Sequence, residues 1–369
     1  MRHWLALFIA LLVSNSLAFA QTSDSQKWND LIARAKQEGE LVVMGPPAAG
    51  FRASLTDAFS KRFGIQLNYI GANSGEIITR VDNETKAGRV SVDVNLGGAS
   101  GCWALAQKGE VESMTGKLIA PDIADPAVWR LGHPKLTDSG NVTGGPNDFT
   151  CGFQTAEWVM TDLFVNTSIV KPSDIISWKD LLKPQYKGKI ASYDPRRSGP
   201  GGTPVGYLAA LFGQQYLTDL YIGQNVRLTA DNRQLAEWVA RGEFPIGIAL
   251  VQFAVEAFRQ QGLPIERVFP ADGQGSVTGG FSVAMLIKNA PHPNAAQVFV
   301  NWFGSQEAQT IYEKEMMEDS LRNDVKGTGV PDYIKPKPGV AYPIDDYSWE
   351  HQSQIRLPAV AALSKELER

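Results

Sequence analysis

A run of arginine, serine and glycine residues, PRRSGPGGTP at 195–204, has the composition of an anion-binding loop. Arg196 and Arg197 could donate paired, charge-assisted hydrogen bonds to a carboxylate or phosphate, and Ser198 and Thr203 could add hydroxyls. Glycine lets backbone N–H groups approach the ligand, and the helix predicted to follow adds its dipole. An ordinary surface turn is the alternative. The candidate ligand-binding residues here are Arg196, Arg197, Ser198, Gly199, Gly201, Gly202 and Thr203.

A second glycine-rich stretch, GGASGCW at 97–103, has the same character without a charge. Ser100 and Gly101 could supply hydrogen-bond donors to a ligand. Trp103 could provide a stacking surface for a ring or carbon chain, although a tryptophan in the core is the alternative. We therefore expect this stretch to face the same ligand as the first run.

Two further positions could reach such a ligand. Arg52 follows the loop GPPAAG at 45–50 and could be a second cation at the site, or an exposed helix arginine. Gly280 belongs to the run Thr-Gly-Gly at 278–280, where glycine would let a ligand approach the backbone or form a bulge.

Motifs for catalysis or metal binding are absent from the sequence. There is no HExxH, CxxC, G-x-S-x-G or P-loop lysine motif, and the four histidines stand apart from one another. We predict no catalytic residue, no metal site and no cofactor. Paired carboxylates for hydrolysis leave no sequence pattern, so a secreted hydrolase remains the competing class.

The N-terminus predicts export. Residues 1–20 combine an early arginine, an apolar run at 4–13 and the sequence Ala-Phe-Ala at 18–20, which is typical of a signal peptide cleaved after Ala20. The apolar run is too short to span a bilayer as a helix. We therefore expect a periplasmic protein with no direct membrane insertion after cleavage; an uncleaved anchor is the alternative.

The cysteines and the net charge indicate a disulfide and bear on the kind of partner. The chain has two cysteines, Cys102 and Cys151. In an oxidising compartment an even count favours a disulfide over two buried thiols. The formal net charge is −4, with no basic tail, so nucleic acid is not expected as a partner.

Alternating apolar strands and amphipathic helices predict an α/β protein of two lobes, each with a mainly parallel sheet. Residues 294–313 are expected to form one helix. Two extended segments, 153–167 and 277–287, are expected to cross between the lobes. Loops 45–52, 97–103 and 194–204 each follow a strand, where ligands of open α/β sheets bind. Together they predict a ligand cleft between the lobes.

Five segments, distributed over nearly all of the chain after residue 20, resemble a known family. They are WNDLIARAKQEGELVV (28–43), FSKRFGIQLNYI (59–70), SVDVNLGGASGCWALAQKGEVE (91–112), WKDLLKPQYKGKIASYDPRRSGPGG (178–202) and GGFSVAMLIKNAPHPNAAQVFVNWFGSQEAQ (279–309). The chain resembles the bacterial extracellular solute-binding proteins of ABC transporters, family 1, and in particular their ferric-iron, polyamine and phosphorylated-sugar binding group.

This resemblance implies the two-lobed type II periplasmic-binding-protein fold, with hinge strands that join the lobes. It implies capture of a small molecule by hinge closure, delivery to a membrane permease and its ATPase, and no catalysis. We expect lobe 1 to comprise 21–150 and 280–330, lobe 2 to comprise 151–279 and 331–369, and the protein to be a monomer. A sensor subunit that passes a ligand signal to a receptor is an alternative role.

One departure from the family bears on the ligand. Ferric binders of this group have adjacent tyrosines after the strand that corresponds to FPIGIAL at 244–250, whereas this chain has Gln252 and Phe253 there. An amide and a phenyl ring are poor Fe(III) ligands. Gln252 could instead bond a polar substituent, and Phe253 could pack on a carbon chain. The expected ligand is a small organic anion (a phosphorylated sugar, phosphonate or carboxylate), with ferric iron or a polyamine as the alternatives.

Overall fold

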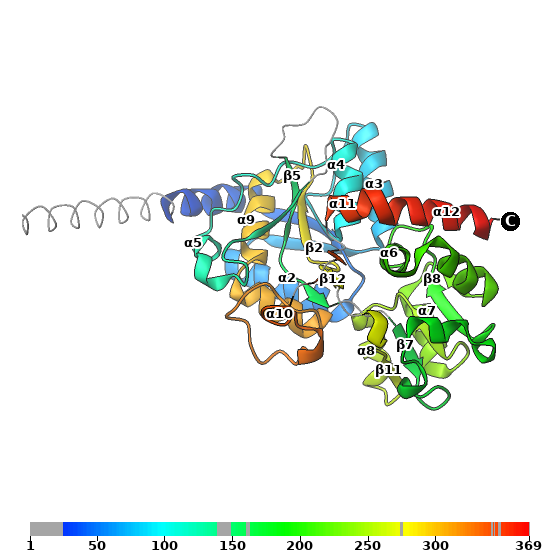
Figure 1. Ribbon diagram of the computed structural model, residues 1–369. Coiled ribbons are helices and arrows are strands. Elements are labelled where there is room, and N and C mark those ends of the chain that lie inside the picture. Colours follow the sequence, from blue (N-terminus) through cyan, green and yellow to red (C-terminus); the bar gives the residue numbers. More distant parts are fainter. Residues whose placement is uncertain are drawn as a thin grey trace, which may run out of the picture.

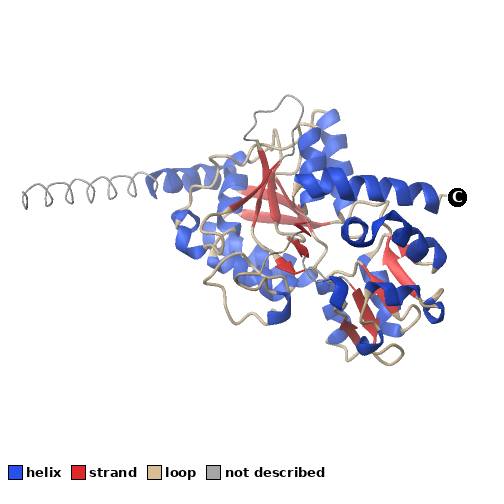
Figure 2. Cartoon of the chain, viewed as in Figure 1, coloured by secondary structure: helices blue, strands red, loops and turns tan. Residues whose placement is uncertain are grey.

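The computed structural model describes residues 25–138, 149–159, 163–273, 276–340, 342, 344–345 and 348–368. The predicted signal peptide, 1–20, lies outside the described residues. Figure 1 shows the course of the chain, and Figure 2 shows a large group of strands in each of two parts of the molecule. The α/β fold with two lobes is confirmed.

The first lobe is built on a six-stranded sheet in the order β2-β1-β3-β13-β5-β4. Aromatic side chains of its helices pack against one another. The ring centroid of Phe59 lies 5.3 Å from those of Phe299 and Trp302. Its strands are β1 (Glu40–Gly45), β2 (Gln66–Gly71), β3 (Val94–Gly97), β4 (Lys135–Asp138), β5 (Thr150–Gln154) and β13 (Val283–Leu286). Its helices include α2 (Ala49–Phe63), α3 (Ser74–Lys86), α4 (Ala99–Gln107), α5 (Pro121–Ala124), α9 (Pro293–Phe303) and α10 (Gln306–Met316).

The second lobe has a five-stranded sheet in the order β11-β7-β10-β8-β9. Its strands are β7 (Leu163–Asn166), β8 (Ile190–Tyr193), β9 (Arg227–Thr229), β10 (Ile246–Ile248) and β11 (Ile265–Arg267). Its helices include α6 (Gly202–Thr218), α7 (Asn232–Arg241), α8 (Gln252–Arg259) and α12 (Leu357–Leu367). The C-terminal helix α12 lies along α6 (Figure 1) and buries Leu363 in this lobe's core.

The sequence predicted mainly parallel sheets, whereas both sheets contain parallel and antiparallel pairs. Strands β1, β2 and β3 are parallel, but β13, β5 and β4 continue the first sheet in antiparallel pairs. In the second sheet β8 is parallel to its neighbours β9 and β10, whereas β7 is antiparallel to β10 and β11. The four strands next to the crossings between the sheets, β5, β7, β11 and β13, all take part in antiparallel pairs.

Short strands connect the lobes. β6 (Trp158–Val159), β12 (Ser276–Thr278) and β14 (Ile344–Asp345) form a three-stranded sheet of their own. The chain crosses from the first sheet to the second between β5 and β7, and it returns between β11 and β13. Because β5 belongs to the first sheet, this lobe extends to Gln154, past the expected boundary at 150. Ile334, expected in the second lobe, packs in the core of the first.

The helix expected at 294–313 is two helices, so that prediction is wrong in detail. α9 ends before Gly304, where an added Cβ would lie 2.6 Å from the ring of Phe153. The hydroxyl of Ser305 then accepts a hydrogen bond from the backbone N–H of Ala308, at 3.3 Å, and starts α10. A serine cap inside an apolar periodic pattern is a helix start.

The predicted disulfide is confirmed. Cys102 of α4 and Cys151 of β5 are bonded, with an S–S distance of 2.02 Å. The bond joins a helix to a strand within the first lobe and closes a loop whose ends are 49 residues apart.

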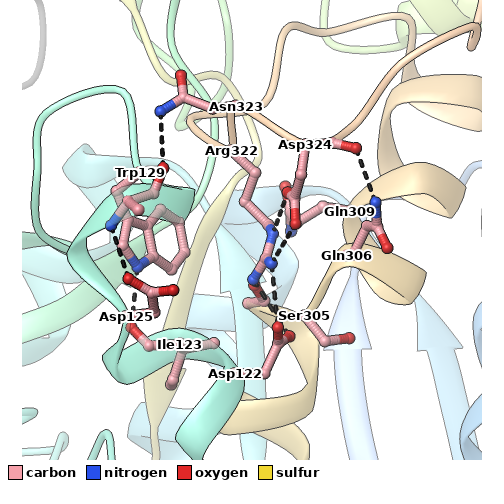
Figure 3. Close-up of polar contacts among 12 residues, drawn as sticks. Asp122, Ile123, Asp125, Trp129, Ser305, Gln306, Gln309, Arg322, Asn323 and Asp324 are labelled. Carbon is pink, nitrogen blue, oxygen red and sulfur yellow. Dashed lines mark hydrogen bonds and ion pairs between the residues drawn. The ribbon is translucent and has the colours of Figure 1, made fainter.

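A buried arginine fastens the segment after α10 to the first lobe (Figure 3). Arg322 is 4% exposed and pairs with Asp122 of α5 at 3.1 Å and with Asp324 at 2.7 Å. Its Nη1 donates to the carbonyl oxygen of Gly304 at 2.9 Å. Its guanidinium lies over the ring of Trp129, 5.6 Å from the centroid. Arg322 therefore holds together three segments that are distant in sequence.

Candidate functional site

A cavity lies between the two lobes, beside the strands that connect them. It is lined by residues of both lobes. The first lobe contributes the starts of α3 and α4. The second lobe contributes the loop before α6 and the starts of α6 and α8. Both lobes and the connecting strands therefore form the walls, as a ligand clamp requires.

The lobes contact each other next to this cavity. Gly75 at the start of α3 faces Ser198 of the second lobe, and an added Cβ on Gly75 would lie 3.5 Å from the Cβ of Ser198. The structure is therefore a conformation in which the two lobes touch across the cleft.

Arg267, at the end of β11, presents the first positive charge to the cavity. Its Nη2 donates to the side-chain oxygen of Gln252 at 2.8 Å. Its guanidinium lies over the ring of Phe164, its register partner on β7, 4.8 Å from the centroid. Strand pairing and an aromatic face thus fix the position of this charge.

Arg356 presents the second positive charge to the cavity. It is the last residue of a π-helical turn, η8 (Gln352–Arg356), and is 7% exposed. Its Nε and Nη2 lie 3.0 Å from the point that a Cβ on Gly202 would occupy. Glycine at 202 therefore leaves the room that this guanidinium fills.

A carboxylate and an aromatic ring lie on another part of the wall. Glu318 is 4% exposed and accepts a hydrogen bond from the hydroxyl of Tyr312. Trp158 of β6 packs against Gly280, where an added Cβ would lie 1.9 Å from the indole ring. Because Gly280 also has a φ of 54°, only glycine fits well there. A carboxylate and an indole suit a hydroxylated carbon skeleton.

Five of the residues predicted from sequence line this cavity. Ser100 comes from α4, Gly199 and Thr203 come from the glycine-rich run, and Gln252 starts α8. Gly280 lies on the connection back to the first lobe. Of the run 195–204, the residues that line the cavity are therefore in the part that follows Ser198.

The predicted arginines lie elsewhere. Arg196 donates to Asp194 from Nε at 2.9 Å and from Nη2 at 2.7 Å. Burial opposes ionisation of Asp194, but the bonds from Arg196 outweigh it and lower the pKa of this carboxyl. Arg197 and Ser198 line a separate depression against α3. Arg52 is exposed beside Tyr69 on the first lobe.

The other predicted residues also lie outside the cavity wall. Trp103 is 2% exposed and donates from its indole nitrogen to the carbonyl oxygen of Asp138 at 2.9 Å, and Gly101 is buried beside it in α4. Gly201 packs on the backbone of β8, and Gly202 packs on Arg356. The ring of Phe253 contacts that of Phe281 with a centroid distance of 5.9 Å.

Sequence reasoning missed several residues that line the cavity. Arg267 carried a usable signal, because it ends a strand at the sheet edge where ligands bind. Arg356, Trp158 and Glu318 had none, because each enters the cavity from a segment whose path depends on the whole fold. Among the described residues, no group of histidine, cysteine and acidic side chains is placed to hold a metal ion.

A family model described as bacterial extracellular solute-binding protein matches residues 54–317. The chain belongs to this family. A relative from Haemophilus influenzae, named only as an uncharacterized protein, is 28% identical over 319 residues, which are 85% of this chain and 84% of the relative. Within the described part of the chain, no helix has the length and apolar character needed to cross a membrane.

Solved structures show the same fold. The periplasmic binding protein AfuA from Actinobacillus pleuropneumoniae, with exogenous fructose-6-phosphate bound, has a TM-score of 0.68 and 22% identity, covering 89% of this chain and 99% of that one. The periplasmic binding protein P5PA has a TM-score of 0.67 at 22% identity, with the same coverage. Iron-bound HitA from Pseudomonas aeruginosa has a TM-score of 0.63 at 17% identity, covering 89% and 98%.

Proposed function

We propose that this solute-binding protein is the periplasmic component of an ABC importer and that it captures a small phosphorylated organic molecule between its lobes. The observation that carries the proposal is the pair of arginines, Arg267 and Arg356, in one interlobe cavity. Arginine suits phosphate because its planar fork donates two parallel hydrogen bonds. AfuA, a structural neighbour, holds a sugar phosphate, which agrees with this choice.

The remaining cavity residues fit the carbon skeleton of such a ligand. Glu318 can accept hydrogen bonds from hydroxyl groups, and Ser100 and Thr203 can donate or accept them. Trp158 offers an apolar face for a sugar ring. Closure of the lobes removes water, and the charged hydrogen bonds then act at a lower dielectric constant and become stronger. Release to the permease follows when the lobes separate again.

A thermal-shift screen of residues 21–369 tests this proposal. The panel holds fructose 6-phosphate, a phosphonate, a dicarboxylate, spermidine and ferric citrate. A ligand at 100 times its dissociation constant stabilises the native state by about 2.7 kcal/mol, which raises Tm by a few degrees. We expect the shift with the phosphate ester. A shift with ferric citrate or spermidine alone would contradict the proposal and favour an iron or polyamine carrier.

A further inference from the structure

The C-terminal segment, residues 348–368, contacts both lobes. In Figure 1 it runs as α11 (Trp349–His351) and α12 from beside α4 to a position above α6. The ring of Trp349 lies 5.6 Å from that of Trp103 in the first lobe. Ala359 and Leu363 are buried in the core of the second lobe. The position of this segment therefore depends on how the two lobes are arranged.

Arg356 lies between these two contacts, and α6 is shaped to receive it. Gly202 and Gly206 are one helical turn apart on the face of α6 that the arginine crosses. An added Cβ on Gly206 would lie 2.7 Å from the Cβ of Arg356 and 3.1 Å from Nε2 of His351. An added Cβ on Gly202 would lie 3.0 Å from the guanidinium. Because neither glycine has a side chain, Arg356 can lie against α6 and extend to the cavity.

The guanidinium ends beside the residues that start α6. Gly199 and Thr203 line the same cavity, and Thr203 is 9% exposed. An arginine on a cavity wall can donate paired, charge-assisted hydrogen bonds to a phosphate. Arg356 also lies beyond residue 317, where the match to the family model ends.

We propose that Arg356 contacts the anionic group of the ligand and that the C-terminal segment is a working part of the binding site. This inference rests on the proposed function. If the segment brings Arg356 to the ligand, then ligand binding must stabilise the docked segment, because coupling between two binding events is reciprocal. The C-terminal segment thus contributes both a specificity residue and a contact that favours the closed lobes.

Calorimetric titration with fructose 6-phosphate compares the wild-type chain with R356A, R356K and K365A. Lys365 is exposed on α12, the helix that follows Arg356, so K365A removes one positive charge without touching the cavity. We expect R356A to weaken binding about 10- to 100-fold, the range for a charged hydrogen bond. R356K is expected to lose several-fold because lysine lacks the planar fork. K365A should stay within about twofold of wild type.

A second pair of variants moves the segment while keeping the arginine. G206A places a methyl group against Arg356 and His351, whereas G223A places one where nothing lies within 4 Å. G206A should weaken binding and G223A should not. Hydrogen exchange supplies an independent readout: saturating fructose 6-phosphate should slow exchange in α12 of the wild type, and R356A should lose this slowing while the start of α3 keeps it.

The outcomes separate the two proposals. Wild-type affinity in R356A, with α12 exchange unchanged by ligand, would overturn the role of the C-terminal segment and leave Arg267 as the cavity arginine on which the proposed function rests. Failure of the wild-type chain to bind fructose 6-phosphate or any other phosphate ester would overturn both.

Discussion

Arg196 and Arg267 are both arginines of the second lobe, but their surroundings differ. The Arg196 side chain is committed to Asp194, and the pair lies in the loop that follows β8. Arg267 is held against Phe164 and Gln252 with its guanidinium at the cavity. The first arrangement stabilises a turn, and the second places a charge at the cavity wall.

Substituting Arg267 by alanine is expected to weaken binding of fructose 6-phosphate by about 1.5 to 3 kcal/mol, the value of a charged hydrogen bond. R196A should change affinity little and should instead lower the midpoint of urea unfolding, because it removes the partner of Asp194. Titration calorimetry and urea unfolding measure the two effects. Equal loss of affinity in both variants would contradict this assignment.

Glu313 predicts a pH dependence of stability. It is 4% exposed and accepts hydrogen bonds from the backbone N–H of Ser320 at 2.9 Å and the hydroxyl of Thr328. Burial outweighs these bonds and raises the pKa of Glu313. The folded protein therefore holds this proton to a higher pH than the unfolded chain. Its contribution to stability is complete below the unfolded pKa, about 4.3, and is lost as pH rises through the folded pKa.

The E313Q variant makes this dependence measurable. Glutamine keeps the acceptor oxygen and stays neutral, so the free energy of unfolding of E313Q relative to wild type should increase from pH 4 to pH 7. Urea unfolding at both pH values measures it. The same difference at pH 4 and pH 7 would show that Glu313 keeps its ordinary pKa in the folded protein.

The residues of the site were only partly predictable from sequence. Glycine-rich runs after strands pointed to Gly199, Thr203 and Ser100, and the structure places these three residues at the cavity, because strand ends meet at one edge of a sheet. Which arginines lie at the cavity could be seen only from the fold. Asp194 stands two positions before Arg196 and captures it, a local pairing that the sequence contains. Arg356 reaches the cavity only because α12 packs on α6.

At the scale of elements, the Arg322 cluster fastens α5, the end of α9 and the segment after α10. R322M keeps the volume of the side chain but leaves Asp122 and Asp324 without their shared cation. The expected loss in unfolding free energy is about 2 kcal/mol, between the ~1 of exposed pairs and the ~3 or more of fully buried pairs. R62M removes the exposed pair between Arg62 and Glu307 and should cost less than ~1 kcal/mol. Equal losses in urea unfolding would contradict a special role for Arg322.

The two-lobed α/β organisation followed from apolar periodicity, but the element bounds did not. The segments expected to cross as 153–167 and 277–287 each contain more than one short strand. The antiparallel pairs in both sheets could not be predicted from periodicity, because strand direction depends on which strands become neighbours after the chain crosses between lobes. Gly304 and Ser305 mark the break between α9 and α10 in the sequence. The apolar pattern continues across these two residues, so periodicity alone predicted one helix.

For the whole molecule, capture of a ligand between the lobes requires the lobes to move. The structure has the lobes in contact at Gly75 and Ser198, and ligand should favour this arrangement over an open one. Small-angle X-ray scattering should therefore give a smaller radius of gyration with fructose 6-phosphate than without it. An unchanged radius at saturation would contradict capture by closure.

Recognition of phosphate is tested most directly by titration calorimetry of residues 21–369 with fructose 6-phosphate and with fructose. The two ligands share a skeleton and differ in the phosphate that Arg267 and Arg356 are proposed to bind. We predict saturable binding of fructose 6-phosphate and an affinity for fructose at least about 100-fold weaker, because two charged contacts are lost. Equal affinity for both sugars, or binding of neither together with binding of ferric citrate, would contradict this prediction.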